Sequence, residues 1–591
     1  MDSKPARRLE QFFPFLAWPR LWRKVGLRGD VIAGITVAMV LVPQALAYAQ
    51  LASLPPQVGL YAALLPAVVA ALFGSCGQLS TGPVALTALL TGASLLPLAR
   101  PDHPDFLAFA ILLALMSGLI QLALGALKAG WLLNLLSRPV MTGFINAAAL
   151  LISLSQLPAL LGLAQPNGNH LLANLTELVT QFDRIDPRTA TFGLGALSVL
   201  VVLRRLTPAL PGVLIVVAGS IAVSAATGFA AHGGSVIGAI PAGLPELALP
   251  AVHPGAIATL LPAAFVIALV SFMEATSSAT LISGRLRENW NRNQELIGQG
   301  LAKLAAACSG AMPVSASFSR SALNYASGAR TGLSSLVAAI AVLLALLYLT
   351  PLLWHLPNAV LAAVILLVVT GLLDLRALAR AWQAGRADGL ASAVTFVATL
   401  AFAPNIQNGI LTGLLLSLAL MLYRDMRPRV ALLGLHPDGT YRDLDRFGLQ
   451  HPDPQLVIMR FDSPLTFVTA EAFEHAVVDS AHAQPDVRTV LVSAAGVNAI
   501  DASGLHAIAQ LVERFAAEGR LLAFCGLKKQ VIDAMERTGL WSRLTPHAHY
   551  RTEAHALATL LPTTAAPAMT AQTDGGVTLP AGQPPGNALD R

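Results

Sequence analysis

The chain has 591 residues, of which 55% are hydrophobic and only 12% are charged, and its mean hydropathy is +0.64. A soluble protein usually carries about 25% charged residues, so this composition excludes an ordinary soluble enzyme. The charges are also unevenly distributed, because only 27 of the 70 lie between Val31 and Tyr423. We therefore expect a polytopic membrane domain in the middle of the chain and aqueous segments at both ends.

The cysteines and the net charge narrow the function classes further. Cys76, Cys308 and Cys525 are too far apart in sequence for a disulfide framework or a metal-ligand cluster, so we expect no cofactor and no metal. A net charge of +6 would suggest nucleic acid as the partner of a soluble protein. In a membrane protein it reflects basic cytoplasmic loops instead, and no nucleic-acid partner is expected.

Residues 1–30 are polar and basic and are predicted to form a cytoplasmic N-terminal segment. The first apolar run starts at Val31 and lacks a small-residue cleavage site, so we expect a retained span rather than a secretory signal. Apolar stretches of helix length, divided by Gly, Pro or charged residues, predict a transmembrane domain over 31–423. The stretches are approximately 31–50, 57–74, 83–97, 106–127, 131–162, 189–205, 211–228, 256–283, 294–311, 319–330, 333–349, 356–373, 388–403 and 405–423.

These fourteen stretches form two groups of seven. The third member of each group, 83–97 and 319–330, is shorter than the ~20 residues that a full crossing needs. Arg and Lys are concentrated in the loops of one predicted side, whereas 229–255 on the other side has none, which places both chain ends in the cytoplasm. An odd number per group makes the two halves inverted repeats, and inverted repeats with a broken third helix are typical of transporters.

The composition changes after Arg429. The apolar runs 456–459, 489–492 and 521–524 predict buried strands, and amphipathic helices lie between them. Strands that alternate with helices predict a small α/β domain over 430–561. The remaining residues, 562–591, are rich in Pro, Thr, Ala and Gly without periodicity, and we expect a disordered tail.

The two short membrane segments are the expected location of the chemistry. Gly82 and Pro83 suit a helix start, because proline at the first helical position has no amide hydrogen to lose. A helix start in mid-membrane offers free backbone N–H groups and a positive dipole end. The second segment begins among small hydroxyl residues and carries Arg320 in its first turn. Two such starts that face one point would form an anion site. The alternative is that the small residues of these segments only permit close helix packing. These residues are Ser80, Thr81 and Ser321.

Among the charged residues within the predicted spans, three bear on the chemistry of the site. Arg320 costs at least ~2.5–3.5 kcal/mol there, so it should either serve a substrate or pair with a carboxylate. An ionised Glu274 about 4 Å from a bound anion would repel that anion by about 4 kcal/mol at an effective dielectric constant near 20. A protonated Glu274 would permit anion binding, which gives a route to proton–anion symport. The alternative is that Glu274 permanently neutralises Arg320 or Lys303, and Lys303 is expected to be mainly structural.

The first span places two further polar groups on one helix face. Gln44 and Tyr48 are four residues apart, and Pro43 frees a backbone carbonyl beside them. An amide and a phenol suit hydrogen bonding to an oxyanion, although a lone Gln in a span can equally hold two helices together.

Several runs together resemble the SulP family of anion transporters: 43–49 (PQALAYA), 54–56 (LPP), 59–61 (GLY) and 78–85 (QLSTGPVA). The resemblance covers about 30–560 and implies a core domain and a gate domain built from seven-plus-seven inverted repeats with broken third and tenth helices. It also implies an anion site between these two broken helices. The substrate-binding residues that it implies are Gln44, Tyr48, Thr81, Gly82, Pro83, Val84, Ala85, Ser317, Phe318, Ser319, Arg320 and Ser321, with Glu274 and Ser278 for proton coupling.

Two departures from the family pattern bear on the coupling ion. Gln44 stands where some bacterial members thought to be proton-coupled have Glu, which weakens a proton site in the first segment. Glu274 stands where sodium-coupled bicarbonate members have Asp, which weakens sodium coupling. The remaining pattern favours Glu274 as the proton carrier.

The C-terminal α/β domain resembles the STAS domain that ends most SulP proteins. Residues 497–505 fit the strand–loop–helix at which related anti-sigma-factor antagonists are phosphorylated on Ser, so Ser503 is a candidate regulatory phosphorylation site. Asp501 or Ser503 would also cap the following helix without any phosphate. By family analogy we expect a homodimer and a cytoplasmic partner of the STAS domain.

The sequence therefore predicts a secondary active transporter of the plasma (cell inner) membrane, which carries out proton-coupled sulfate symport by alternating access with an elevator-like movement of core against gate. The alternatives are a bicarbonate, dicarboxylate or chloride transporter, an exchanger or channel on the same scaffold, or a membrane anchor for a sensor module. An enzyme is not expected, because no nucleophile–base set or set of metal ligands stands out. The expected partners are a small inorganic or carboxylate anion, a proton and the lipid bilayer.

Overall fold

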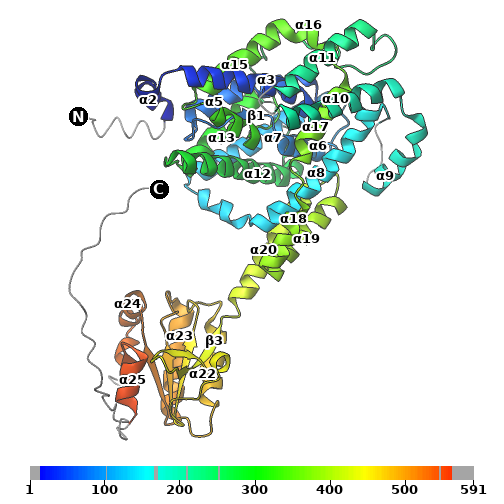
Figure 1. Ribbon diagram of the computed structural model, residues 1–591. Coiled ribbons are helices and arrows are strands. Elements are labelled where there is room, and N and C mark those ends of the chain that lie inside the picture. The colour runs from blue at the N-terminus through cyan, green and yellow to red at the C-terminus, as the bar shows by residue number, and fades with distance from the viewer. Residues whose placement is uncertain are drawn as a thin grey trace, which may run out of the picture. The chain divides into compact units, whose positions relative to one another are not determined.

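The computed structural model describes residues 13–101, 103–164, 171–207, 211–241, 243–250, 253–544 and 548–561. The chain divides into two compact units, Met1–Leu420 and Met421–Arg591 (Figure 1). The tail predicted to be disordered, 562–591, lies outside the described residues.

The first unit is helical. Within the described residues, eight helical segments are long and apolar enough to cross a membrane. The longest regular examples exceed the ~30 Å hydrocarbon thickness at 1.5 Å per residue. Its elements are η1 (Pro14–Ala17), α2 (Trp18–Val25), α3 (Arg28–Leu51), α4 (Pro56–Ala62), α5 (Leu65–Phe73), β1 (Thr81–Gly82), α6 (Ala85–Leu95), α7 (Pro104–Ala126), η2 (Gly130–Leu135), α8 (Arg138–Leu161), α9 (Leu171–Thr180), η3 (Phe182–Arg184), α10 (Pro187–Leu206), α11 (Gly212–Thr227), α12 (Pro254–Leu286), α13 (Arg292–Cys308), β2 (Ser315–Ala316), α14 (Phe318–Ala326), α15 (Leu333–Leu344), η4 (Ala345–Leu349, a π-helix), α16 (Thr350–Leu353), α17 (Asn358–Thr370), α18 (Leu375–Ala384), α19 (Arg386–Ala401) and α20 (Gln407–Asp425).

The predicted stretches coincide with these helices, with two differences in detail. The stretch 131–162 does not form one helix, because α8 begins only at Arg138, where the Ser137 hydroxyl accepts a hydrogen bond from the Val140 amide. The residues before it form the short η2. The stretch 57–74 is divided into α4 and α5 at Ala63 and Leu64, ahead of a proline in the first turn of α5.

The two short segments meet in the middle of this unit. Strands β1 and β2 pair in antiparallel orientation, with Thr81 opposite Ala316 and Gly82 opposite Ser315. Each strand leads directly into a short helix, α6 or α14. The predicted helix start at Gly82 and Pro83 is wrong by a few residues: Gly82 belongs to the strand, Val84 is still extended, and α6 begins at Ala85.

Helix α13 lies against both α5 and α7, and α12 also packs on α7. The contact between α13 and α7 depends on two glycines that let the backbones approach closely. A Cβ atom on Gly300 would lie 2.7 Å from the Leu122 amide nitrogen, and one on Gly118 would lie 2.9 Å from the Lys303 Cβ. Small residues at such contacts are the usual means of packing membrane helices.

The second unit is an α/β domain with one six-stranded mixed sheet, in the order β4-β3-β5-β6-β7-β8. Strands β5 to β8 are parallel, whereas β3 is antiparallel to both of its neighbours. The elements are β3 (Val430–Leu435), β4 (Tyr441–Asp443), α21 (Leu444–Phe447), β5 (Leu456–Phe461), α22 (Ala470–Ala481), β6 (Thr489–Ser493), α23 (Ala502–Ala517), β7 (Leu521–Cys525), α24 (Lys529–Arg537), η5 (Trp541–Arg543), β8 (His549–Tyr550) and α25 (Glu553–Leu560).

The central strands of this sheet are covered on both faces, which explains their continuous apolar runs. Val457 and Val490 belong to the core shared with α22 and α23. The alternate residues Ile458 and Leu491 belong to a second core that includes Ala556 of α25. The three predicted strands are present as β5, β6 and β7, and the sequence analysis missed β3, β4 and β8.

Candidate functional site

Hydrogen bonds hold the two broken segments together at the β1–β2 pair. The Ser317 amide donates to the Ser80 carbonyl at 2.9 Å, and the Ser80 amide donates to the Ser321 hydroxyl at 2.9 Å. Two loops more than 230 residues apart in sequence are thus joined by backbone and hydroxyl groups, and they bring the first turns of α6 and α14 into one region.

Arg320, in the first turn of α14, occupies the centre of this region. Its side chain is only 1% exposed. Nη1 donates to the Gln44 Oε1 at 3.2 Å, and Nε donates to the Ser80 hydroxyl at 3.4 Å. The third nitrogen, Nη2, is buried and has no hydrogen-bond partner among the described residues. A buried donor of a charged group without an acceptor costs free energy, so this position suits an anionic ligand.

A methyl group could be accommodated at Gly82, in contact with the unpaired nitrogen. A Cβ atom on Gly82 would lie 3.4 Å from Arg320 Nη2 and 3.7 Å from Leu41 Cδ1. Any side chain at this position would therefore cover the face of the guanidinium that has no partner.

The first membrane helix contributes the predicted polar pair. Gln44 and Tyr48 both lie on α3 and are both buried, and Gln44 contacts Arg320 directly. This contact joins α3 to α14, as expected both for a residue of the anion site and for a Gln that holds two helices together.

Glu274, on α12, lies next to β2. Its Oε2 accepts a hydrogen bond of 2.6 Å from the Ser315 hydroxyl, and Ser315 is the residue paired with Gly82. Within the part of the chain that the structure describes, no ion pair joins Glu274 to Arg320 or Lys303. Ser278 is one turn further along α12, and its hydroxyl donates to the Glu274 backbone carbonyl at 2.9 Å.

Lys303, on α13, is fully buried, and its hydrogen-bond partners among the described residues are neutral. Its Nζ donates to Gln121 Oε1 at 2.7 Å and to the Ser271 hydroxyl at 2.8 Å. Gln121 in turn donates to Ser271 at 2.9 Å. Ser271 is also joined to β2, because its carbonyl accepts from the Ser315 hydroxyl at 3.2 Å.

The Thr81 hydroxyl is hydrogen-bonded by a side chain of α13. Gln299 Nε2 donates to the Thr81 hydroxyl at 2.9 Å and to Glu295 Oε1 at 3.0 Å. Glu295 Oε2 accepts in addition from the amides of Ser75 and Cys76, at 2.8 and 3.2 Å, and thus fixes the loop that leads into β1.

The other predicted residues differ in their surroundings. Pro83, Ala85, Ser317 and Ser321 are buried around the strand pair, and Val84 is half-buried. Phe318 and Ser319 are exposed, Phe318 to 53%, whereas the adjacent Arg320 is buried.

Five polar residues that hold the site together were not predicted from the sequence, four of them neutral and one, Glu295, acidic. In the sequence, such a residue is visible only as a polar side chain in the middle of an apolar stretch. Its role depends on partners from distant helices, which the sequence does not reveal. The missed residues are Gln121, Ser271, Glu295, Gln299 and Ser315.

In the second unit, Asp501 rather than Ser503 caps α23. Its Oδ1 accepts from the Gly504 amide at 3.0 Å and its Oδ2 from the Phe467 amide at 2.8 Å. The predicted phosphorylation site, Ser503, lies in the first turn of α23 and is exposed.

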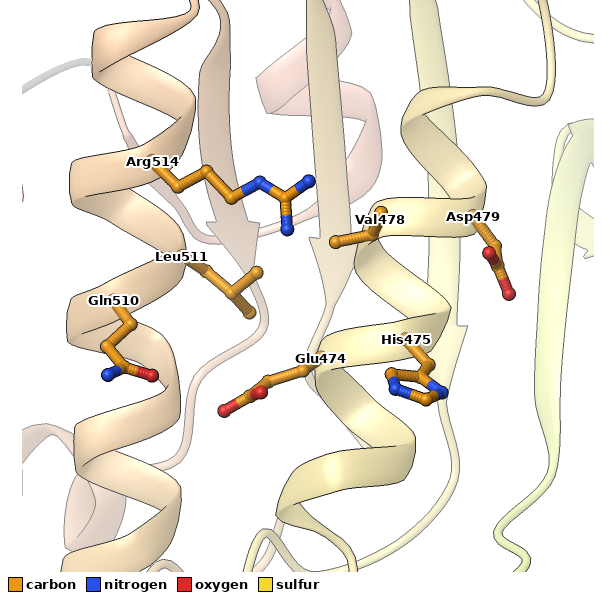
Figure 2. Close-up of a pocket in the computed structure, with 7 residues that line it drawn as sticks. All are labelled: Glu474, His475, Val478, Asp479, Gln510, Leu511 and Arg514. Carbon is orange, nitrogen blue, oxygen red and sulfur yellow. The ribbon is translucent and has the colours of Figure 1, made fainter.

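A groove of about 480 Å³ lies between α22 and α23 (Figure 2). Arg514 extends from α23 toward α22, and the groove carries charges of both signs. Its lining residues are Glu474, His475, Val478, Asp479, Gln510, Leu511 and Arg514. Among the residues that the structure describes, no group of three or more His, Cys, Asp or Glu could hold a metal ion.

A bundle of membrane-length helices, interrupted by two paired broken segments, and followed by a compact α/β domain, defines an integral membrane transporter. The chain belongs to the sulfate permease family, whose profile matches residues 27–395, and the STAS domain profile matches residues 449–555. Its relatives are transporters rather than enzymes. The predictions of the family, of the two-part fold and of a non-enzymatic function are confirmed.

Two curated relatives cover most of the chain. A probable sulfate transporter of Arabidopsis thaliana is 32% identical over 90% of this chain and 81% of its own length. A probable sulfate transporter of Mycobacterium tuberculosis is 33% identical over 90% of this chain and 94% of its own length.

Solved structures share the fold. The murine anion transporter Slc26a9, in the inward-facing state, is 21% identical, with a TM-score of 0.87 over 94% of this chain and 95% of that chain. The transmembrane domain of the cyanobacterial bicarbonate transporter BicA is 25% identical, with a TM-score of 0.57 over 66% of this chain and 97% of that chain. The protein is thus an anion transporter of the sulfate permease family.

Proposed function

We propose that the protein is a secondary active transporter that moves sulfate together with a proton. The observation that carries this proposal is the buried Nη2 of Arg320, a charged donor without an acceptor where the two broken segments meet. A cation within a membrane segment is costly, and a bound oxyanion supplies the acceptor that Nη2 lacks. The names of the plant and mycobacterial relatives support sulfate as this anion.

The proposed anion position is the space beside Gly82 and Arg320 Nη2. The first turns of α6 and α14 add backbone N–H groups and positive dipole ends on two sides, which favour an anion. Thr81 accepts from Gln299, so its own hydroxyl hydrogen can donate to the anion. We assign the binding role to Gln44, Tyr48, Thr81, Gly82, Pro83, Val84, Ala85, Ser317, Arg320 and Ser321, and the approach to the site to the exposed Phe318 and Ser319.

Glu274 is the proposed proton carrier. An anion bound beside Gly82 lies on the strand pair that also contacts Glu274 through Ser315. A charge of like sign about 4 Å away costs about 4 kcal/mol at an effective dielectric constant near 20, so anion binding and protonation of Glu274 favour each other. A protonated carboxyl group retains an acceptor oxygen for Ser315, and proton uptake therefore leaves that hydrogen bond possible. Ser278 is the proposed positioning residue, through its bond to the Glu274 carbonyl.

We further propose that the transport domain, 31–423, consists of two inverted sets of seven segments and works by alternating access, with a core that moves against a gate. Antiparallel pairing of β1 with β2 supports this, because equivalent strands of two inverted halves run in opposite directions. The plasma membrane location, cytoplasmic chain ends, a homodimer, a cytoplasmic partner of the STAS domain and phosphorylation of Ser503 remain predictions.

Uptake of labelled sulfate into proteoliposomes, with and without a pH gradient, tests the proposal. We expect accumulation above equilibrium when the outside is acidic, loss of accumulation with a protonophore, and competition by unlabelled sulfate. Bicarbonate, chloride and oxalate in the same competition assay identify the alternative substrates. Uptake that requires an internal exchangeable anion and ignores the pH gradient would refute symport.

A further inference from the structure

We infer that Lys303 sets the charge preference of the anion site, and that it makes the protein favour divalent oxyanions over monovalent ones of the same shape. This inference rests on the proposed function, because it concerns the anion bound beside Arg320. It gives a specific role to a cation that the sequence suggested to be structural.

The first step is that Lys303 is a charge without a counter-charge in contact. Its side chain is completely buried, and among the residues that the structure describes its Nζ bonds to the Gln121 amide oxygen and the Ser271 hydroxyl. An ammonium group has three donors and no acceptor, and both observed partners accept from it. A buried cation that is satisfied only by neutral groups leaves an electrostatic field that a nearby anion can use.

The second step is that Lys303 is connected to the anion site by a short chain of contacts. Ser271 bonds to Lys303 through its hydroxyl and to Ser315 through its carbonyl. Ser315 is paired with Gly82, whose open side faces Arg320 Nη2. Lys303 and Arg320 are therefore both connected by hydrogen bonds to the region of the β1–β2 pair.

The third step is to identify the other charged groups on the helices around Lys303. Glu274 on α12 reaches the same Ser315, and Arg320 is the charge on α14. Helix α5 has no charged residue between Leu65 and Phe73, and the polar group of α7 that faces Lys303 is Gln121. Glu295 lies on α13 itself, two turns before Lys303, and accepts from Gln299, Ser75 and Cys76.

The charges of this region sum to zero when both carboxylates are ionised, because Arg320 and Lys303 are positive and Glu274 and Glu295 are negative. A proton on Glu274 leaves one positive charge, so protonation of Glu274 and binding of an anion favour each other. Loss of the Lys303 charge removes this surplus, and a divalent anion loses more affinity by it than a monovalent one.

The size of the effect follows from Coulomb's law. At about 10 Å and an effective dielectric constant near 20, one unit charge changes the affinity for a monovalent anion by roughly tenfold. The interaction energy doubles for a divalent anion, so its affinity changes by roughly a hundredfold. Removal of the Lys303 charge should therefore lower the preference for the divalent anion by about tenfold.

The test compares sulfate with perchlorate, which are both tetrahedral and differ in charge. Binding of each anion to the full-length protein in detergent is measured by isothermal titration at constant pH, for the wild type, Lys303→Met and Gln121→Glu. Gln121→Glu keeps Lys303 in place and puts a negative charge beside its Nζ, which is 2.7 Å from Gln121 Oε1. We expect the sulfate-to-perchlorate affinity ratio to fall about tenfold in both variants.

Gln121→Met is the matched control, because it removes the same hydrogen bonds without adding charge, and it should leave the ratio unchanged. A purely structural role for Lys303 predicts the opposite pattern, in which Gln121→Glu is harmless and Gln121→Met resembles Lys303→Met. If the wild type binds sulfate and both charge variants keep the wild-type sulfate-to-perchlorate affinity ratio, the role of Lys303 is refuted and the proposed anion site is not. If the wild type binds neither anion, the proposed anion site is refuted as well.

Discussion

Substitution of Gly82 by alanine is a small change with a calculable effect on the anion site. The added methyl group would lie 3.4 Å from Arg320 Nη2, 3.7 Å from Leu41 Cδ1 and 3.9 Å from the Ala62 carbonyl oxygen. Contacts of this length do not force the backbone apart, and Gly82 has no positive φ that would disfavour alanine. The protein should therefore fold normally.

The methyl group would nevertheless cover the guanidinium nitrogen that has no partner. A hydrogen bond to a charged group contributes about 1.5–3 kcal/mol, so its loss should weaken anion binding by roughly 10- to 150-fold. The assay is sulfate binding and proteoliposome uptake with equal amounts of folded protein. Gly195→Ala is the matched control, because a Cβ on Gly195 meets nothing within 4 Å. Unchanged sulfate affinity in Gly82→Ala would refute the placement of the anion beside Arg320.

Two further predictions concern Arg320 in the membrane unit and Cys525 in the α/β domain. Arg320→Ala should lower sulfate affinity at least as much as Gly82→Ala and also lower the melting temperature, because Gln44 and Ser80 lose a donor; normal affinity would give Arg320 a structural role. In the α/β domain, burial raises the pKa of the Cys525 thiol to about 12, so Cys525 should resist iodoacetamide at pH 8 until the domain unfolds. Rapid alkylation of the folded protein, followed by mass spectrometry, would contradict this.

The helices of the membrane unit could be predicted because each depends on a local signal. An apolar run such as 106–127 is long enough to span a membrane, and Pro and Gly mark its ends, so α7 (Pro104–Ala126) matches within two residues. Arg320 and Glu274 could be singled out for a similar reason, since a charge in a membrane segment is costly and needs an explanation.

The pairing of distant segments could not be predicted in the same way. Strands β1 and β2 have two residues each, too few to show the period of a strand, so the helix start was placed at Gly82 instead of Ala85. The partner of Lys303, Gln121, is 182 residues away, and no local pattern connects them. The strand β3 (Val430–Leu435) was missed because only its position beside β5 identifies it.

The central claim, that one site couples an anion to a proton, is tested most directly by sulfate accumulation in proteoliposomes containing Glu274→Gln. The glutamine has the shape and charge of the protonated acid, so it should still admit sulfate, and counterflow down a sulfate gradient should persist. Glu246→Gln makes the same chemical change at an exposed position and should behave as the wild type. We predict that an acid-outside pH gradient no longer drives accumulation in Glu274→Gln, whereas undiminished pH-driven accumulation would contradict the account.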